Sequence, residues 1–555
     1  MDKRLGILFV IALVVVATVA FVSGCTSPTT SPTASATPAK NYTIVNMEAG
    51  EPESLDPAFA YDSASYEIVQ NCAETLIYFN GTDTVHPVGI LATSWDVSPD
   101  GLTYTFHLRD GVYFQDGTKF NASAVKYTFD RGVIMNQGPY ASDISPYILG
   151  GPEYMASNFT DADVKAYLAK NAVEVVNETT VRMHLESPYS AWLYAMSFAG
   201  CSIISPTADQ LNGGYSPNNQ STWANEHLVG TGPFVFKEWQ HKDHITMVRN
   251  DNYWGTPAKP SQVIIRYVSE WADRKLALDK GDADYILGDN AMHIGELRND
   301  TAAAIDVYSP TMTINFIGMN ERIPPFDNVT VREAFVESFD YNTFSNKVLN
   351  GFATTPNGCI PSGMLGYNAS APTPTYNPTH AKQLLQQMGY SKDKPTNFTI
   401  YYNTGSAARE TACLLLKQSL ESYDLGITVN VQEIDWPTYL KMERAHTMPI
   451  FQLGWIADFP SSDNFVNPFA FSQGYYTAHI AYNNPKVDAL YKQSLNTTDP
   501  AQLDNIYNQI NTQLMNDNAY IWLDIPQNVF VHGPTVKGYV YCPLDSALIY
   551  KDMTK

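Results

Sequence analysis

Few residues of this chain stand in a pattern that could carry out a reaction. His241 and His244 flank Lys242-Asp243. On a strand this spacing would place the two imidazoles on opposite faces, so a solvated turn explains them better than a metal site. The chain holds no Gly-x-Ser-x-Gly, His-Glu-x-x-His or Walker A motif. Carboxylates are frequent, as on the solvated face of any acidic chain. We therefore expect no enzyme, with no catalytic residue, no metal and no cofactor.

Asp458 is an acidic residue with two opposed interpretations. It follows Gly454-Trp455-Ile456-Ala457 and precedes Phe459-Pro460-Ser461-Ser462. An Asp in a Pro- and Ser-rich turn commonly caps its own loop. In a cleft that closes and excludes water, the same carboxylate would instead pair with a ligand ammonium, because a buried ammonium without a partner is costly. These residues alone favour the first interpretation.

The first 40 residues predict export and attachment to a membrane surface. An unbroken apolar run, Leu5–Val22, fits a secretory signal or a single membrane anchor. Ser23-Gly24-Cys25 resembles the end of a lipoprotein signal, in which Cys25 becomes the lipidated first residue of the mature protein. We expect residues 1–25 to be the signal peptide and residues 26–40, rich in Thr, Ser and Pro, to be a flexible tether. An uncleaved helix would leave the same topology.

Size, charge and cysteine content limit the number of lobes, the class of partner and the disulfides that can be expected. About 515 residues follow the tether, more than one hydrophobic core usually supports, so at least two lobes are expected. The formal net charge of −22 argues against nucleic acid as a partner and is explained most simply by solubility. An exported chain permits disulfides, but the sequence does not fix how the remaining five cysteines pair. These are Cys72, Cys201, Cys359, Cys413 and Cys542.

Asn-x-Ser/Thr sequons recur along the chain. In a cytosolic protein they would be accidents of an Asn- and Thr-rich composition. In an exported protein they are candidate glycan sites that keep their loops at the surface. Their asparagines are Asn41, Asn80, Asn121, Asn158, Asn177, Asn219, Asn299, Asn328, Asn368, Asn397 and Asn496.

The elements that would position these residues follow from alternation and helical periodicity. Alternation on both sides of Pro99-Asp100-Gly101 predicts a hairpin of strands 91–98 and 102–108, and residues 109–114 repeat the strand pattern. Further strands are expected over 42–45, 180–185, 233–239, 245–249, 313–319, 398–402, 427–432, 527–531 and 538–541.

Helices are expected between these strands. One runs over 65–75, one over 121–129 with Asn121 as its cap, and one over 331–339 with Thr330 as its cap. Two more are expected over 380–388 and 407–420. The alternation of strands and helices after residue 310 implies a mixed α/β lobe.

Seven short blocks form a recognisable series along the chain. They are Leu55-Asp56-Pro57, Glu74-Thr75-Leu76, Leu91-Ala92-Thr93-Ser94-Trp95, residues 100–118, Gly230-Thr231-Gly232-Pro233-Phe234, Pro325-Phe326-Asp327-Asn328-Val329 with Val331-Arg332, and residues 454–459. In this order the set resembles family 5 extracellular solute-binding proteins, the dipeptide-, oligopeptide- and nickel-binding subunits of ABC importers. One block alone would be weak evidence, but together they extend over nearly the whole mature chain.

The resemblance implies a two-lobed α/β fold of the periplasmic-binding-protein type, type II, in the large cluster that carries an extra subdomain. The ligand cleft would lie between the lobes, which close like a hinge. Lobe I would be discontinuous, formed by 41–310 plus 525–555, and lobe II would cover 311–524. The protein would act as a monomer at the outer face of the cytoplasmic membrane, anchored by its lipid, and deliver peptides to ABC permease subunits.

The resemblance also implies the ligand-binding residues. Asp458 matches the position where peptide-binding members hold the ligand's α-amino group with a carboxylate. Two segments match those that pair with the peptide backbone, a sequence-tolerant mode of recognition. They contribute Gly454, Trp455, Ile456 and Ala457, and Pro57, Tyr61 and Asp62. Trp455 fits a pocket wall and ordinary core packing equally well.

One departure from the family pattern leaves the ligand class open. Peptide-binding members often supply an Arg for the ligand carboxylate from the loop after the strand at 398–402. Here residues 403–406 carry none, and Arg409 is expected on the following helix. Alternatives to a peptide are a nickel chelate, haem or an oligosaccharide in the same fold, and a secreted hydrolase. The acidic Asp458 counts against a nickel chelate, which needs no ammonium partner.

Overall fold

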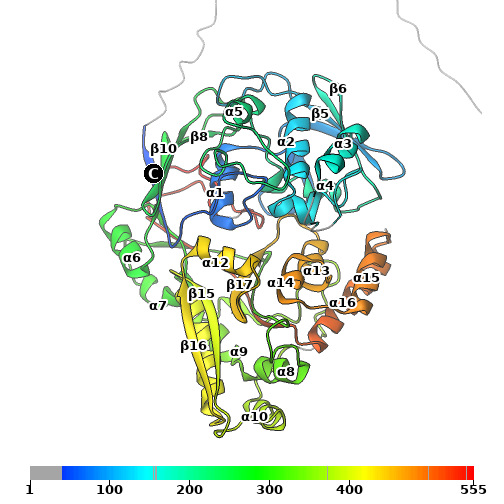
Figure 1. Cartoon of the computed structure of the whole chain (residues 1–555). Coiled ribbons are helices and arrows are strands. Elements are labelled where there is room, and N and C mark those ends of the chain that lie inside the picture. The colour runs from blue at the N-terminus through cyan, green and yellow to red at the C-terminus, as the bar shows by residue number, and fades with distance from the viewer. Residues whose placement is uncertain (1–40, 154–155, 157–158, 372, 498, 546) are drawn as a thin grey trace, which may run out of the picture. The chain divides into compact units, whose positions relative to one another are not determined.

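The computed structural model describes residues 41–153, 156, 159–371, 373–497, 499–545 and 547–555, which belong to one compact unit (Figure 1). The expected signal peptide, the tether, Cys25 and Asn158 lie outside the described residues. No described helix is both long enough and apolar enough to cross a bilayer. None of the ten sequon asparagines that are described is buried.

A seven-stranded mixed sheet organises the first part of the fold, called lobe I below. β1 lies near its centre, between β10 and β11, and pairs with both in parallel. The strand order is β12-β19-β11-β1-β10-β9-β8. The bounds are β1 Thr43–Glu48, β8 Phe234–Gln240, β9 His244–Arg249, β10 Gln262–Tyr267, β11 Tyr285–Ile286, β12 Ala304–Tyr308 and β19 Asn528–His532. β19 comes from the C-terminal segment, which therefore returns to the sheet that contains β1.

Two smaller antiparallel sheets belong to the same part of the chain. One has the order β4-β5-β7-β6, and its first two strands are the hairpin predicted around Asp100-Gly101. The bounds are β4 Ala92–Val97, β5 Thr103–Leu108, β6 Val173–Asn177 and β7 Thr180–His184. The other pairs β2 Ile77–Asn80 with β3 Asp83–Gly89. The helices are α1 Ser63–Cys72, α2 Ala122–Met135, α3 Asp161–Lys170, α4 Trp192–Ala195, α5 Pro206–Leu211, α6 Trp271–Lys280 and α7 Ile294–Leu297.

A six-stranded mixed sheet, with the helices around it, forms lobe II. Its order is β14-β18-β13-β17-β15-β16. The strands are β13 Thr313–Met319, β14 Ala353–Thr354, β15 Thr396–Asn403, β16 Ile427–Ile434, β17 Ile450–Ile456 and β18 Tyr520–Pro526. The helices are α8 Val329–Ser338, α9 Tyr341–Thr343, α10 Pro378–Gln387, α11 Ala407–Ser422, α12 Trp436–Arg444, α13 Asp463–Ala470, α14 Tyr475–Ile480, α15 Pro485–Leu495 and α16 Pro500–Asn516.

Each face of this sheet is covered because both carry apolar side chains. On one face Phe316 packs with Phe469 and Trp522 in a core that also holds residues of α15 and α16. On the other face Ile317 belongs to a core with Phe335 of α8 and residues of α11. A β-strand sends successive side chains to opposite faces, so β13 supplies both cores and is buried from Phe316 to Met319.

Most predicted elements are confirmed, with differences at their ends. Asn121 caps α2, because its side chain accepts hydrogen bonds from the N–H groups of Ser123 and Ala124. The cap of α8 is Asn328 rather than the predicted Thr330. The Asn328 side chain accepts from the N–H of Thr330, and Asn is a stronger cap than Thr.

Two predicted strands are wrong. Residues 109–114 form only an isolated bridge, Tyr113 with Lys119, and Gly111 has φ +76°, a left-handed conformation that interrupts a strand. Residues 538–541 likewise form no strand. Gly538 has φ +87°, and a Cβ there would lie 2.2 Å from the carbonyl oxygen of Asp552, so the chain turns sharply where the alternation suggested extension.

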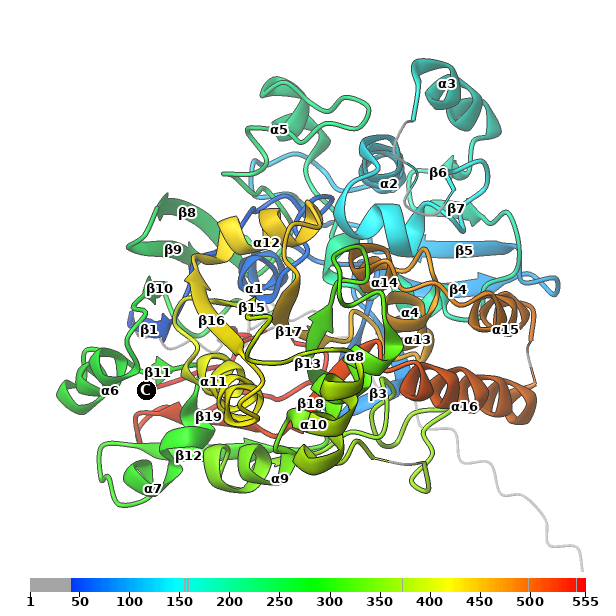
Figure 2. The same cartoon turned by 60° about the horizontal axis from the view of Figure 1, so that its bottom comes forward.

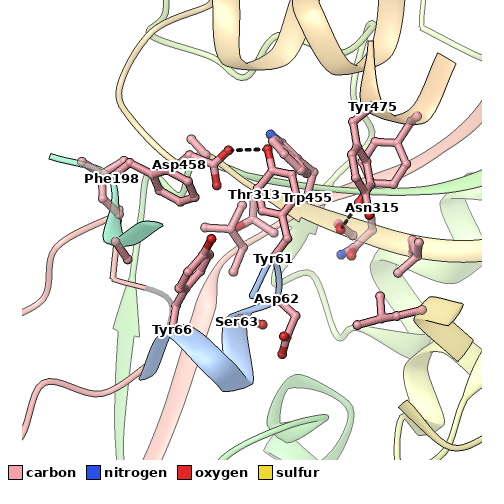
Figure 3. Close-up of a pocket in the computed structure, with 18 of the residues that line it drawn as sticks. Tyr61, Asp62, Ser63, Tyr66, Phe198, Thr313, Asn315, Trp455, Asp458 and Tyr475 are labelled. Carbon is pink, nitrogen blue, oxygen red and sulfur yellow. Dashed lines mark hydrogen bonds between the residues drawn. The ribbon is translucent and has the colours of Figure 1, made fainter. Parts of the chain in front are cut away.

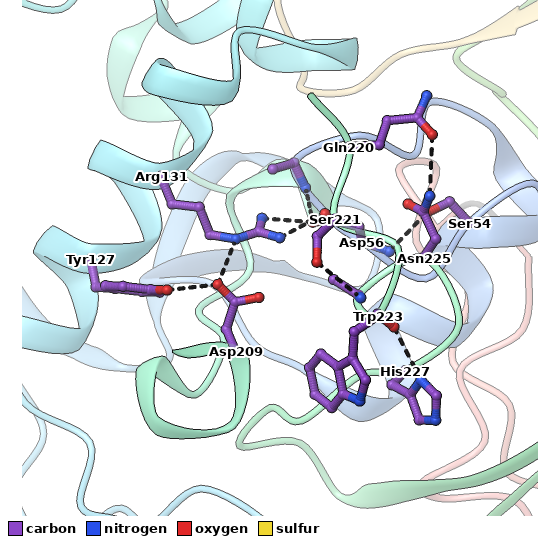
Figure 4. A network of polar contacts seen from close by, with 12 residues as sticks. Ser54, Asp56, Tyr127, Arg131, Asp209, Gln220, Ser221, Trp223, Asn225 and His227 are labelled. Carbon is purple, nitrogen blue, oxygen red and sulfur yellow. Dashed lines mark hydrogen bonds and ion pairs between the residues drawn. The ribbon is translucent and has the colours of Figure 1, made fainter. Parts of the chain in front are cut away.

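A buried ion network explains the first block of the resemblance (Figure 4). Arg131, 1% exposed on α2, forms two hydrogen bonds with the carboxylate of Asp56, at 2.8 and 2.7 Å. Its Nε also donates to Asp209 at 3.1 Å, and Tyr127 donates to the same oxygen. Asp56 is therefore a structural residue that ties the segment before α1 to α2 and α5.

Candidate functional site

Three adjoining cavities lie between lobe I and lobe II. The Asp458 chamber, about 160 Å³, is lined by Tyr61, Trp455 and Asp458 (Figure 3). The Asp524 chamber, about 290 Å³, is lined by Asp289, Asn315, Asp524 and Asp545, and the Gly405 chamber, about 300 Å³, by Glu48, Gly405 and Trp436. Arg409 lines all three. Shared walls make them parts of one cleft.

Asp458 is held in place just after the end of β17. Its N–H donates to Oδ1 of Asn464 at 2.7 Å, and Nδ2 of Asn464 donates to its Oδ2 at 3.1 Å. Asn464 lies on α13 and is itself buried. The carboxylate therefore has a fixed direction, and it lines the cleft rather than only capping its own turn.

Tyr61 bridges Asp458 to a second acid, Asp143. Its hydroxyl oxygen lies 3.0 Å from Oδ2 of Asp458 and 2.8 Å from Oδ2 of Asp143 (Figure 3 shows the contact with Asp458). A phenol has one proton to donate, so it serves one carboxylate at a time. The second contact is a hydrogen bond only if that carboxyl group carries a proton. If both contacts are hydrogen bonds, one of the two acids is protonated.

The environment of the pair favours the protonated form. Burial raises the pKa of Asp143 to about 7, and burial together with the charge of Asp143 raises the pKa of Asp458 well above its usual range. Asp143 lies in a π-helical turn, Tyr140–Ile144. Asp463 adds a further negative charge near Asp143 and has a pKa raised by burial to about 6. A cation that entered beside Asp458 would reverse this balance and drive deprotonation.

These acids predict a pH dependence of the ligand-free protein. A carboxyl whose pKa is higher in the folded chain stabilises the fold fully below its unfolded pKa, near 4, and loses that contribution as pH rises through the folded value. Asp143 and Asp463, with folded values of about 7 and 6, place this loss between about pH 4 and 8. We expect urea denaturation to give a free energy of unfolding at least about 1 kcal/mol lower at pH 8 than at pH 5.

The Asp143→Asn variant is the matched control for this dependence. It removes one titrating group and keeps a similar shape, so the difference between the two pH values should shrink. A wild-type stability that stays constant or rises from pH 5 to pH 8 would contradict the assigned protonation.

The strand before Asp458 has an open edge. β13 pairs with β17 along its whole length, from Ile450 to Ile456. On the other edge β15 pairs only with Ile450 and Phe451, so residues 452–456 have no strand partner on that edge in the described structure, although the Gln452 carbonyl accepts from the Tyr439 hydroxyl at 2.7 Å. A free strand edge offers backbone N–H and C=O groups to an extended ligand.

Trp455 takes part in both the core and the cleft. Its indole N–H donates to the carbonyl of Asn464 at 2.9 Å, and its ring meets Tyr61 edge to face at 5.6 Å between centroids. The side chain lines the Asp458 chamber but is only 6% exposed. The two interpretations of Trp455 are therefore compatible.

The other residues expected at the site divide into two groups. Gly454, Ile456, Ala457, Tyr61 and Asp62 line the Asp458 chamber. Pro57 lines a different, small cavity with Trp223 and Leu228. Asp62 also caps α1 and accepts from the indole N–H of Trp436 at 3.2 Å. A Cβ on Gly454 would lie 2.5 Å from Oδ1 of Asn315, so a larger residue there would displace the Asn315 side chain.

Arg409 reaches the cleft although it lies on α11, as expected. Its Nη1 donates to Oδ1 of Asn403 at 2.6 Å, and the guanidinium lies 5.7 Å from the ring centroid of Trp436. Among the described residues no carboxylate lies within 4 Å of it. Its position on a helix was predictable from the sequence, but the direction of its side chain was not. Asp143 and Asp524 were not anticipated at all, because both come from segments without a recognisable motif.

Contacts across the cleft connect the two lobes. Figures 1 and 2 both place α12 beside α1, where Trp436 bonds Asp62. Arg444 of α12 forms an ion pair with Glu53. Asp289 of lobe I accepts from the N–H groups of Ala407 and Ala408, at 2.7 and 3.1 Å, at the start of α11. A carboxylate at a helix N-terminus is favourable, so these contacts stabilise the packing of the two lobes against each other.

The other reactive residue types lie elsewhere. The five described cysteines are buried and form no disulfide. His241 sits in the turn between β8 and β9, with carboxylates of Glu51 and Glu226 at 3.2 and 3.0 Å. Among the described residues, the side chains close enough together to hold a metal ion are Glu333, Glu337 and His380. None of the three lines any of the three chambers.

Comparisons with known proteins agree with this geometry. Residues 86–477 match the model of the bacterial extracellular solute-binding proteins, family 5 Middle. The chain is 27% identical to the probable D,D-dipeptide-binding periplasmic protein DdpA of Escherichia coli over 508 residues, covering 90% of this chain and 92% of that protein. It is also 27% identical to heme-binding protein A of Haemophilus influenzae over 527 residues, covering 93% of each.

A solved structure gives the same picture of the fold. The periplasmic binding protein DppA of Helicobacter pylori, in complex with the peptide STSA, aligns with a TM-score of 0.78 at 25% identity, covering 93% of this chain and 98% of that one. The expected α/β periplasmic-binding-protein fold, with mixed sheets forming lobes, is confirmed. Proteins of this kind bind a solute outside the cytoplasm for an ABC importer and are not enzymes, which excludes the hydrolase.

Proposed function

Because the chain belongs to family 5 of the bacterial extracellular solute-binding proteins, we propose that its cleft captures short peptides with a free amino terminus and delivers them to an ABC permease. The observation that carries this proposal is Asp458, a fixed carboxylate in a closed cleft without a cation partner. A ligand ammonium would supply the missing charge and form charge-assisted hydrogen bonds.

The free edge of β17 supports an extended backbone as the remainder of the ligand. Residues 452–456 lead directly to Asp458, so a chain paired antiparallel to β17 along this edge would have its amino terminus at the carboxylate. Backbone pairing does not depend on side chains, which suits a receptor for many peptides. Gly454 and Ile456 are its backbone contacts in this proposal, with Trp455, Ala457, Tyr61 and Asp62 as walls of the chamber.

Arg409 is the cation that the cleft offers to the ligand carboxylate. It faces all three chambers, and its guanidinium has Asn403 rather than an acid as its close partner. A planar guanidinium can hold a carboxylate with two parallel hydrogen bonds. The proposed carboxylate partner therefore comes from the first turn of α11 and not from the loop before it.

The paired acids argue against the other ligand classes. A nickel chelate, haem or an oligosaccharide offers no primary ammonium to Asp458 and Asp143. DdpA and heme-binding protein A are similar to this chain to the same degree, so similarity does not choose between a peptide and haem. The chemistry of the Asp458 chamber favours the peptide.

We place the division between the lobes at the two segments where the chain crosses from one sheet to the other. The first follows β12, which ends at Tyr308, and the second is Gln527, between β18 and β19. These points are close to the boundaries at 310 and 524 proposed from the sequence. Closure about them, and lipid attachment through Cys25 at the outer face of the membrane, complete the proposed mode of action.

Calorimetry on protein that has been unfolded, washed and refolded tests the proposal, because a ligand retained through purification would mask binding. We expect a pool of di- to hexapeptides to bind, and the same pool acetylated at its amino termini to bind far more weakly. No heat with the free-amine pool, or equal affinity for the two pools, would overturn the peptide function.

A further inference from the structure

We propose that the Asp524 chamber is a second subsite, which selects peptides with a basic side chain. The inference rests on the proposed peptide function and specifies its substrate class. Asp524 lies near the end of β18, opposite Asn315 of β13, and its side chain is 1% exposed. Asp545 enters from the C-terminal segment of lobe I, so the subsite is completed only where the two lobes meet.

The two carboxylates have polar partners but form no ion pair with a described residue, although the charge of Arg409 in the same chamber acts on Asp524. Nδ2 of Asn315 donates to Oδ1 of Asp524 at 3.0 Å, and the hydroxyl of Tyr78 donates to Oδ1 of Asp545 at 2.9 Å. Neither acid has a Lys, Arg or His within 4 Å among the described residues. The third acid of the chamber, Asp289, is already bonded to the N-terminus of α11.

Burial without a directly paired cation leaves these acids in a costly environment. It raises the pKa of Asp524 to about 6, although Asn315 and the charge of Arg409 offset part of the effect, and that of Asp545 to about 7. An isolated buried carboxylate is unfavourable, whereas one paired with a cation and hydrogen-bonded is tolerated. An ammonium or guanidinium from the ligand would supply that pairing.

The arrangement fits an organic cation better than a metal ion. Oxygens of Asp289, Asp524 and Asp545 do not gather within 4.8 Å of one another in the described structure. A spread set of acceptors suits the several N–H donors of a lysine or arginine side chain. The chamber's volume of about 290 Å³ leaves room for such a chain.

Arg409 favours a basic peptide over a simple polyamine as the ligand, because it needs a carboxylate partner. It lies at the wall shared by the Asp458 and Asp524 chambers, together with Thr313, Asn315 and Ile456. A ligand that satisfies the whole cleft carries an amine for Asp458, a carboxylate for Arg409 and a second cation for Asp524 and Asp545. A basic peptide has all three groups, whereas a polyamine lacks the carboxylate.

The test compares two pools of di- to pentapeptides that differ only in carrying one lysine or one norleucine at matched positions. With refolded protein, we expect the lysine pool to bind roughly tenfold more tightly, about 1.4 kcal/mol. Asp524→Asn and Asp545→Asn should each bring this ratio close to one. Asp393→Asn, at an exposed position outside the chambers, is the control and should preserve the ratio.

The outcomes distinguish a failure of the proposed basic subsite from a failure of the proposed peptide function. Equal affinity for both pools would overturn the basic subsite and leave peptide binding intact. A preference for lysine that survives both substitutions would show that the selectivity arises elsewhere. Binding of 1,5-diaminopentane as tight as that of the lysine pool, with no binding of norleucine peptides, would overturn the subsite and the peptide function together.

Discussion

Asp458→Asn is expected to weaken binding of a free-amine peptide by more than about a hundredfold, near 3 kcal/mol, as for other buried charge pairs that lose one member. The substitution keeps the shape of the side chain, and its amide can still bond Asn464 and Tyr61. It removes the charge that would hold the ligand ammonium. Calorimetry at pH 8, where the acids of the cleft are most ionised, measures the effect.

The acetylated form of the same peptide is the internal control for Asp458. It has no ammonium, so its weaker binding should change little between wild type and variant. Equal losses for the free and acetylated peptides would mean that Asp458 supports the loop and does not contact the ligand. Circular dichroism and the urea midpoint show whether the variant is folded.

Arg131→Met should lower the free energy of unfolding by about 3–5 kcal/mol. It leaves the carboxylates of Asp56 and Asp209, 0% and 1% exposed, without their shared cation (Figure 4). Urea denaturation at pH 7 measures the loss. The network lies outside the chambers, so peptide affinity of the folded fraction should stay the same.

Arg182→Met is the matched control for this network. Arg182 pairs with Glu174 at 2.8 Å, but both side chains are about one-third exposed, and such pairs contribute less than about 1 kcal/mol. The triple variant Arg131→Met, Asp56→Asn, Asp209→Asn should recover most of the lost stability. A cost for Arg131→Met no larger than for Arg182→Met would contradict the role given to the network.

The blocks that identified the family in the sequence are mainly structural. Asp56 neutralises Arg131, and Glu74 accepts from Thr231, Tyr253 and Trp254, which links two of the blocks directly. The glycines of the block at 230–234 are needed for close packing, because a Cβ on Gly230 or Gly232 would lie 2.5 Å from the backbone of Cys72. Such residues are readable from sequence because one backbone geometry requires one residue type.

The chemistry of the cleft was harder to predict, for a physical reason. Asp143 of lobe I is linked to Asp458 of lobe II through Tyr61, whereas Arg409 and Asp524 lie on separate elements of lobe II and line the same chamber. The spacing of residues along the sequence does not predict that these side chains lie close together in space. Asp458 was the exception, because it belongs to one of the recognisable blocks, residues 454–459. The direction of the Arg409 side chain became visible only from the packing of α11 against α12.

Mass spectrometry of the ligand carried by the purified protein tests the central claim most directly. The protein should be isolated without denaturation, examined intact and then unfolded to release its contents for sequencing. We predict a mass increment made of short peptides with free amino termini, enriched in lysine and arginine. A stoichiometric metal chelate, haem or oligosaccharide in place of peptides would contradict the account.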